Sequence, residues 1–270
     1  MPEKIRLILT APPSDVQAAS ARGLPIGHMA YRAGPGGRLL RAGMPMGLRG
    51  GLMVVDSGDF RGGGDAGFFC QQVIRECAGR GFDGVILDFE QPQQPFLTQV
   101  VSTLGGLLAR RGWPLYVTEE YAGASELTKI LIPSALSGGS LARRLSEAAE
   151  RFGADRVALG IQRTAEDFLL PSPDGCGTPL SREELEQRVR SRGACVFFSD
   201  DLCAHYFTYM TRQGGAHFVL FDNAASIRKK ILTAARLGLY ACVLAWPEVD
   251  DILDNILEQG AFIPRGGGCP

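Results

Sequence analysis

One nine-residue stretch, residues 82–90 (FDGVILDFE), constrains the fold of this chain most strongly. It holds five apolar residues and ends in two acids, Asp88 and Glu90. Side chains of a strand alternate between its two faces, so Ile86, Asp88 and Glu90 share one face. Because both faces are largely apolar until the end, the pattern predicts a parallel strand that is covered on both sides. Parallel α/β barrels place their catalytic groups at this end of a strand.

The two acids are expected to influence each other's ionisation. Their Cα atoms would lie roughly 6–7 Å apart on one face of the strand. At that distance, repulsion between like charges separates the two pKa values, so that one acid holds a proton while the other stays ionised. The structural alternative is that Asp88 and Glu90 serve as a helix cap or a surface ion pair.

Strand-like and helix-like patterns alternate along the rest of the chain with short connections. This alternation predicts an α/β fold, a (β/α)8 TIM barrel, in one domain that spans residues 1–270. Helical periodicity occurs at 66–80, 96–111, 140–152 and 224–237. The eight expected strands are residues 5–10, 26–32, 51–56, 82–90, 114–121, 128–132, 156–161 and 240–246.

The passage between the seventh and eighth expected strands is longer than an ordinary crossover. Residues 164–222 are therefore expected to form a small α/β insertion on the rim of the barrel. Within it, a polar loop at 171–180 precedes a charged helix at 181–191. Two short strands are expected at 195–199 and 217–222.

Composition excludes several classes of function. The net charge is −1, with Lys and Arg dispersed, so nothing points to nucleic acid or an anionic membrane as a partner. The seven cysteines include no Cys-x-x-Cys pair, and the three histidines lack metal-ligand spacing. We therefore expect no metal or cofactor, and carboxylates are the leading catalytic candidates.

The beginning of the chain bears on its localisation. Its apolar core of about four residues is too short for a signal peptide. No run approaches the roughly 18 apolar residues that a membrane helix needs. These features predict a cytoplasmic protein.

The strand at residues 82–90 also carries a family resemblance. Its pattern Asp83-Gly84-x-x-x-Asp88-x-Glu90 is similar to the signature of the family 18 glycoside hydrolases, the chitinases and their relatives. That signature reads Asp-Gly-x-Asp-x-Asp-x-Glu and lies on the fourth barrel strand.

A second block near the carboxyl end supports this resemblance. Residues 221–227 and the lysines that follow resemble the family's segment before its last strand, and residues 239–246 resemble the last strand itself. Trp246 stands in place of the tryptophan that floors the sugar site in that family. Residues 249–251 match the acidic turn after it.

The resemblance implies substrate-assisted, retaining hydrolysis of an N-acetylglucosamine-containing glycan of chitin or peptidoglycan type, a known exception to the usual two-carboxylate scheme. Glu90 would protonate the leaving glycosidic oxygen. The acetamido oxygen of the substrate would attack the anomeric carbon, while Asp88 orients the acetamide and stabilises the oxazolinium. The ligand would be an internalised oligosaccharide or, in a spore former, spore wall material.

Two departures from the family pattern affect this expectation. Ile86 replaces the middle aspartate of the signature, and its apolar side chain should raise the pKa of Asp88 by desolvation. The family's Met-x-Tyr-Asp at the end of the sixth strand is missing from residues 131–135. Tyr121, on the fifth expected strand, is a candidate to replace the missing tyrosine.

The remaining candidates for substrate binding come from the ends of other strands. Glu119 and Tyr121 end the fifth strand, Gln162 ends the seventh, and Asp56 ends the third. Trp246 would provide an aromatic surface for a sugar, although a tryptophan packed in the core gives the same pattern. A solvated loop is the alternative for Glu119, Tyr121 and Asp56.

Two other functions remain open from the sequence. A catalytically inactive family 18-like barrel that binds a glycan or a protein partner would explain the loss of the middle aspartate and the tyrosine. The barrel could also catalyse a different reaction that uses Glu90 and Glu119.

Overall fold

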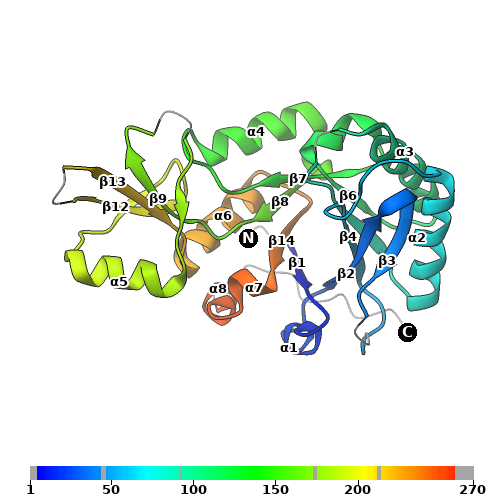
Figure 1. Cartoon of the computed structure of the whole chain (residues 1–270), viewed down its shortest axis with the longest axis horizontal. Coiled ribbons are helices and arrows are strands. Elements are labelled where there is room, and N and C mark those ends of the chain that lie inside the picture. The colour runs from blue at the N-terminus through cyan, green and yellow to red at the C-terminus, as the bar shows by residue number, and fades with distance from the viewer. Residues whose placement is uncertain (1–4, 44–46, 92, 173–174, 212–213, 259–270) are drawn as a thin grey trace.

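The computed structural model describes residues 5–43, 47–91, 93–172, 175–211 and 214–258. Eight parallel strands close into a barrel, because the first strand pairs with both the second and the last (Figure 1). The predicted (β/α)8 fold is confirmed. Residues 1–4 and 259–270 of the predicted domain lie outside the described part. In sheet order the barrel strands are β1 (Arg6–Ala11), β2 (Ile26–Gly34), β4 (Leu52–Asp56), β5 (Gly84–Asp88), β6 (Leu115–Thr118), β7 (Lys129–Pro133), β8 (Val157–Ile161) and β14 (Ala241–Ala245).

Helices cover the outside of the barrel (Figure 1). The helix before β5 shows how the sequence sets its ends. The Asp65 carboxylate accepts a hydrogen bond from the Phe68 amide at 3.1 Å, and Gly81 ends the helix with a φ of 74°, which glycine adopts without strain. The helical segments around the barrel are α1 (Val16–Ser20), η1 (Pro35–Gly37), α2 (Ala66–Arg80), α3 (Pro95–Ala109), η2 (Glu119–Ala124), α4 (Leu141–Phe152), η3 (Ala154–Arg156), α6 (Ala224–Arg236), α7 (Trp246–Val249) and α8 (Leu253–Leu257).

The alternation of β5 separates two layers of the core. Val85 and Leu87 point outward and pack in a cluster with residues of α2 and α3. Ile86 points inward and is buried among Val54, Tyr116 and other side chains that fill the barrel. The predicted sharing of faces within this strand is therefore confirmed.

The insertion between β8 and β14 forms its own antiparallel sheet and lies beside the barrel (Figure 1). Its helix α5 (Arg182–Arg192) begins with a capping box in which Ser181 and Glu184 exchange hydrogen bonds. The sequence predicted this helix but only two of the five strands of the sheet. In sheet order the strands are β10 (Thr178–Pro179), β9 (Ala165–Leu170), β13 (Ala216–Phe221), β12 (Ala204–Met210) and β11 (Phe197–Ser199).

The remaining strand, β3 (Arg38–Arg41), pairs antiparallel with the end of β2 outside the barrel. Within the described residues, none of the helices has the length and apolar character that crossing a membrane requires.

Candidate active site

A cleft of about 400 Å³ opens at the carboxyl ends of the barrel strands. Its floor is the apolar filling of the barrel, and its walls carry carboxylates and one side-chain amide, that of Gln162. Both acids at the end of β5 line it. The lining residues are Thr10, Met29, Val54, Ile86, Asp88, Glu90, Thr118, Glu119, Glu120, Leu131, Pro133, Gly160, Ile161, Gln162, Val243, Ala245 and Glu248.

Asp88 and Glu90 differ in their surroundings. Asp88 is half-buried and Glu90 is exposed. Neither carboxylate has a hydrogen-bond partner among the described residues, so both are free to engage a ligand. The backbone between them is held in place by the Thr118 hydroxyl, which donates to the carbonyl oxygen of Phe89 at 2.9 Å.

The pKa of Asp88 is raised above its ordinary value of 3.8. Burial is the main cause, because it disfavours the charged form, and the negative charges of Glu90 and Asp56 add to it. Ile86 lies one inward position below Asp88 and is itself buried. The rise in the pKa of Asp88 that was expected from an apolar residue at position 86 is therefore confirmed.

Replacing Asp88 by asparagine is expected to stabilise the fold at neutral pH, because the amide removes a desolvated, repelled charge. The gain should be about 1 kcal/mol, or about 2–4 °C in Tm. A raised folded-state pKa means that the folded protein binds the proton more tightly than the unfolded chain. Stability therefore falls as pH rises from 3.8 through the folded-state pKa. Thermal unfolding of both proteins between about pH 3 and pH 8 should show the advantage of Asp88→Asn only above this window. An equal gain in Tm for Asp88→Asn at every pH would contradict a raised pKa of Asp88 in the folded protein.

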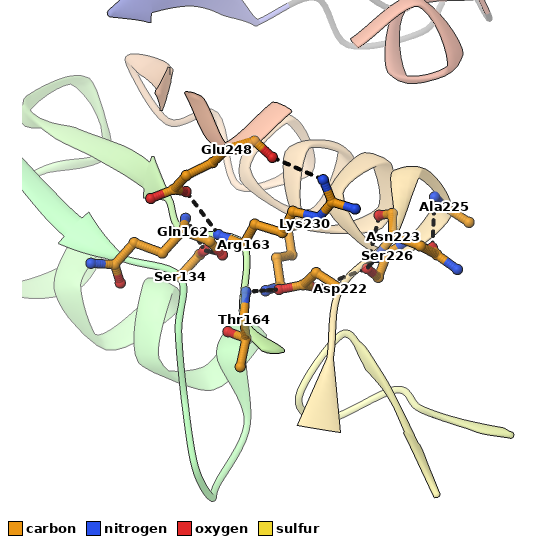
Figure 2. Close-up of polar contacts among 10 residues, drawn as sticks. All are labelled: Ser134, Gln162, Arg163, Thr164, Asp222, Asn223, Ala225, Ser226, Lys230 and Glu248. Carbon is orange, nitrogen blue, oxygen red and sulfur yellow. Dashed lines mark hydrogen bonds and ion pairs between the residues drawn. The ribbon is translucent and has the colours of Figure 1, made fainter. Parts of the chain in front are cut away.

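Glu119 and Gln162 line the cleft, as predicted from their positions at strand ends. Glu119 also pairs with Arg144 of α4 at 2.7 Å, so its charge is balanced. The backbone of Gln162 is held by Ser134, whose hydroxyl accepts from the Gln162 amide at 3.0 Å. Figure 2 shows the side chain of Gln162 pointing away from Arg163.

The structure places Tyr121 outside the cleft. Its side chain is fully buried, packs edge-on against Phe89 with ring centroids 5.6 Å apart, and donates to the carbonyl oxygen of Gln91 at 3.3 Å. The chain turns into η2 directly after β6, which carries Tyr121 into the helix layer. The expectation that Tyr121 replaces the missing tyrosine of the sixth strand is therefore wrong.

Trp246 also lies outside the cleft. Ala245 takes the inward position at the end of β14, so Trp246 faces the outer core, where it is 8% exposed. The Arg22 guanidinium lies 6.0 Å from its ring centroid. Core packing, the alternative raised by the sequence, describes its position. The residues lining the cleft, all within the described part of the chain, include no aromatic side chain.

Asp56 faces a neighbouring cavity instead of the main cleft. Its carboxylate lies 3.3 Å from the Nε atom of Arg32 and accepts from the Gly58 amide at 2.9 Å. This second cavity, of about 470 Å³, is also lined by Arg32 and Asp59. Asp56 pairs in register with Asp88 across β4 and β5 and acts on that residue through its charge.

Glu248 is a cleft residue that sequence reasoning missed. It lies in the short helix α7, directly after β14, and its Oε2 atom accepts from the Arg163 amide at 2.9 Å (Figure 2). Burial raises its pKa above the ordinary value. The available signal was its position three residues beyond the last barrel strand, where polar side chains of a barrel meet in the active site.

The second block of the family resemblance forms the base of the insertion (Figure 2). Asp222 and Lys230 are both buried and form an ion pair at 2.7 Å. Asp222 also accepts from the Ser226 hydroxyl at 2.7 Å and from the Thr164 amide at 3.0 Å. Asn223 caps α6 by accepting from the amides of the first turn. These residues join the two ends of the insertion and lie outside the cleft.

The fold and the cleft together define the class of protein: a (β/α)8 barrel whose fourth strand ends in two carboxylates that have no hydrogen-bond partner among the described residues. No protein-family model matches the sequence, and no curated protein matches it.

Solved structures with the same fold are found among chitinases and spore cortex-lytic enzymes. The spore cortex-lytic enzyme SleL of Bacillus megaterium QM B1551 has a TM-score of 0.68 at 14% identity, over 98% of this chain and 76% of that one. A chitinase from Chromobacterium violaceum ATCC 12472 has a TM-score of 0.67 at 18% identity, over 94% and 98% of the two chains. The GH18 chitinase of Cycas revoluta, solved in complex with (GlcNAc)3, has a TM-score of 0.60 at 16% identity, over 93% and 97%. The chain therefore has a divergent family 18, chitinase-like fold.

Proposed function

We propose that this protein is a glycoside hydrolase that acts on an N-acetylglucosamine-containing glycan, of chitin or peptidoglycan type, by substrate-assisted retaining hydrolysis. The observation that carries the proposal is the pair Asp88 and Glu90, which face an open cleft of about 400 Å³ with no hydrogen-bond partner among the described residues. The fold shared with chitinases, one of them bound to (GlcNAc)3, supports the choice of ligand.

In the proposed reaction, the exposed Glu90 gives its proton to the glycosidic oxygen as the bond to the anomeric carbon breaks. The acetamido oxygen of the same sugar forms the new bond to that carbon, which produces an oxazolinium ion. Asp88 holds the acetamide and stabilises the positive charge. A water molecule then gives its proton to the Glu90 carboxylate and its hydroxyl to the anomeric carbon, which restores the acetamide and retains the configuration.

The test compares two fluorogenic oligosaccharides of equal length and identical leaving group, one built from N-acetylglucosamine and one from glucose. The proposal predicts hydrolysis of the first and none of the second, because only the first carries the nucleophile. Proton NMR of the initial product should show the retained anomer. Equal rates on both substrates, or an inverted product, would contradict the substrate-assisted route.

A catalytically inactive barrel that binds glycan or a protein partner is the second candidate. The position of Tyr121 and Trp246 in the core favours it, since the described lining of the cleft then holds no phenol for the acetamide and no aromatic floor for the sugar. Calorimetric binding of the N-acetylglucosamine oligomer, with no product after prolonged incubation, would support this candidate and exclude the hydrolase.

A further inference from the structure

Glu248 faces the catalytic pair across the mouth of the barrel. In the closed sheet, β5 is the fourth strand and β14 the eighth, so their ends lie on opposite sides of the cleft. Asp88 and Glu90 follow from β5, and Glu248 follows from β14; all three line the same space. A sugar chain that fills the cleft is therefore contacted by acids on both sides.

The protein holds the Glu248 carboxylate by one of its two oxygen atoms. Its Oε2 atom accepts from the Arg163 amide at 2.9 Å, which fixes the side chain. Its Oε1 atom has no donor among the described residues. The two cations that act on its charge, Arg163 and Lys230, are each paired with another acid: Arg163 with Asp251 at 2.7 Å, and Lys230 with Asp222 at 2.7 Å.

The charge of the cleft is unbalanced. Its described lining contains five carboxylates and no lysine or arginine. Among the described residues, only one of the five, Glu119, has a cationic partner, Arg144. Clefts lined by one sign of charge attract ligands of the other sign and repel ligands of the same sign. Burial also disfavours the ionised form of Glu248, a cost that a cation inside the cleft would offset.

We propose that Glu248 is a specificity-determining residue that binds the free ammonium group of a sugar adjoining the one that is cleaved, so that the preferred substrate is a partly de-N-acetylated glycan. This inference rests on the proposed function. Successive rings of a β-1,4-linked chain face opposite ways. When the acetamide of the reacting sugar points toward Asp88, the nitrogen of its neighbour points toward the opposite wall, where Glu248 lies. The same charge disfavours glycans that carry free carboxylates beside the cleaved bond.

The test uses two fluorogenic oligomers of equal length. Both keep the acetamide on the reacting sugar; in one, the neighbouring sugar carries a free amine, and in the other it is acetylated. Wild type should show about tenfold higher kcat/KM and tighter Kd for the amine, the size expected for one hydrogen bond between charged groups. Raising the salt concentration from about 0.05 M to about 0.5 M should shrink this preference.

The variant Glu248→Gln should reduce the preference for the amine to about twofold or less. Its amide oxygen can still accept from the Arg163 amide, so the fold should persist, which Tm verifies. The matched control is Glu150→Gln, an exposed glutamate of α4 outside the cleft, which should keep the full preference. Equal kcat/KM and Kd for the two oligomers in wild type, or a preference that salt and Glu248→Gln leave unchanged, would overturn the inference. Hydrolysis of neither oligomer, with tighter binding of the amine, would refute the proposed hydrolase and retain the role of Glu248.

Discussion

Replacing Glu90 by glutamine is expected to lower kcat/KM for a fluorogenic N-acetylglucosamine oligomer by about 10²–10⁴-fold. Glutamine keeps the shape of the side chain but has no acidic proton for the leaving oxygen. Because Glu90 is exposed and has no hydrogen-bond partner among the described residues, the substitution leaves no buried group unsatisfied. Tm should therefore stay within about 1 °C of wild type, since surface substitutions of this kind change stability little.

Two substrates with different leaving groups distinguish loss of the proton donor from loss of substrate binding. A dinitrophenyl glycoside needs little protonation to depart, so Glu90→Gln should slow its cleavage far less than that of a glycoside with a sugar leaving group. The Kd for the intact oligomer should change only a few-fold. Glu150→Gln, which alters an exposed acid away from the cleft, controls for the change in net charge. An equal loss on both leaving groups would assign Glu90 a binding role instead of an acid role.

The fold could be predicted because its signals are local. The period of two in residues 82–90 places Ile86 and Leu87 on opposite faces without knowledge of their neighbours, and the structure has them so. The same pattern places Asp88 and Glu90 at the carboxyl end of a barrel strand, where the ends of parallel strands surround one cleft. Gln162 and Glu119 reach this cleft for the same reason.

The positions of Tyr121, Trp246 and Asp56 could not be predicted in this way. Each lies where a strand ends, and the first turn after the strand decides which way its side chain points. The turn into η2 buries Tyr121, and the start of α7 sends Trp246 outward. The ion pair with Arg32 holds Asp56 beside another cavity.

Glu248 is the opposite case, because the sequence did not assign it to the cleft and the structure places it there. It reaches the cleft because α7 begins immediately after β14, and its third residue, Glu248, faces the barrel mouth. The strand β9 of the insertion depends on a distant partner in the same way, since it cannot be distinguished from a loop until its neighbour β13 is known, whereas β12 pairs with the strands directly before and after it in the chain.

Replacing Lys230 by methionine is expected to destabilise the protein by about 3–5 kcal/mol, the usual cost of leaving a buried charge without its partner. The Asp222 carboxylate would keep its hydrogen bonds from Ser226 and Thr164 but lose the cation 2.7 Å away. Methionine fills a similar volume, so the lost stability reflects the unpaired charge of Asp222 and not a cavity. Urea unfolding followed by circular dichroism measures the free energy of unfolding.

The adjacent lysine provides a matched control. Lys229 pairs at 3.2 Å with Asp200, whose side chain is 83% exposed, so Lys229→Met should cost less than about 1 kcal/mol. The double variant Asp222→Leu with Lys230→Met removes both charges and should recover part of the loss, because a buried ion pair replaced by apolar residues is often neutral. A cost below about 1 kcal/mol for Lys230→Met would mean that the pair does not hold the base of the insertion. Because Asp222 joins Thr164 at one end of the insertion to α6 at the other, a large cost would identify this part of the family resemblance as a structural junction, separate from the two acids at the end of β5.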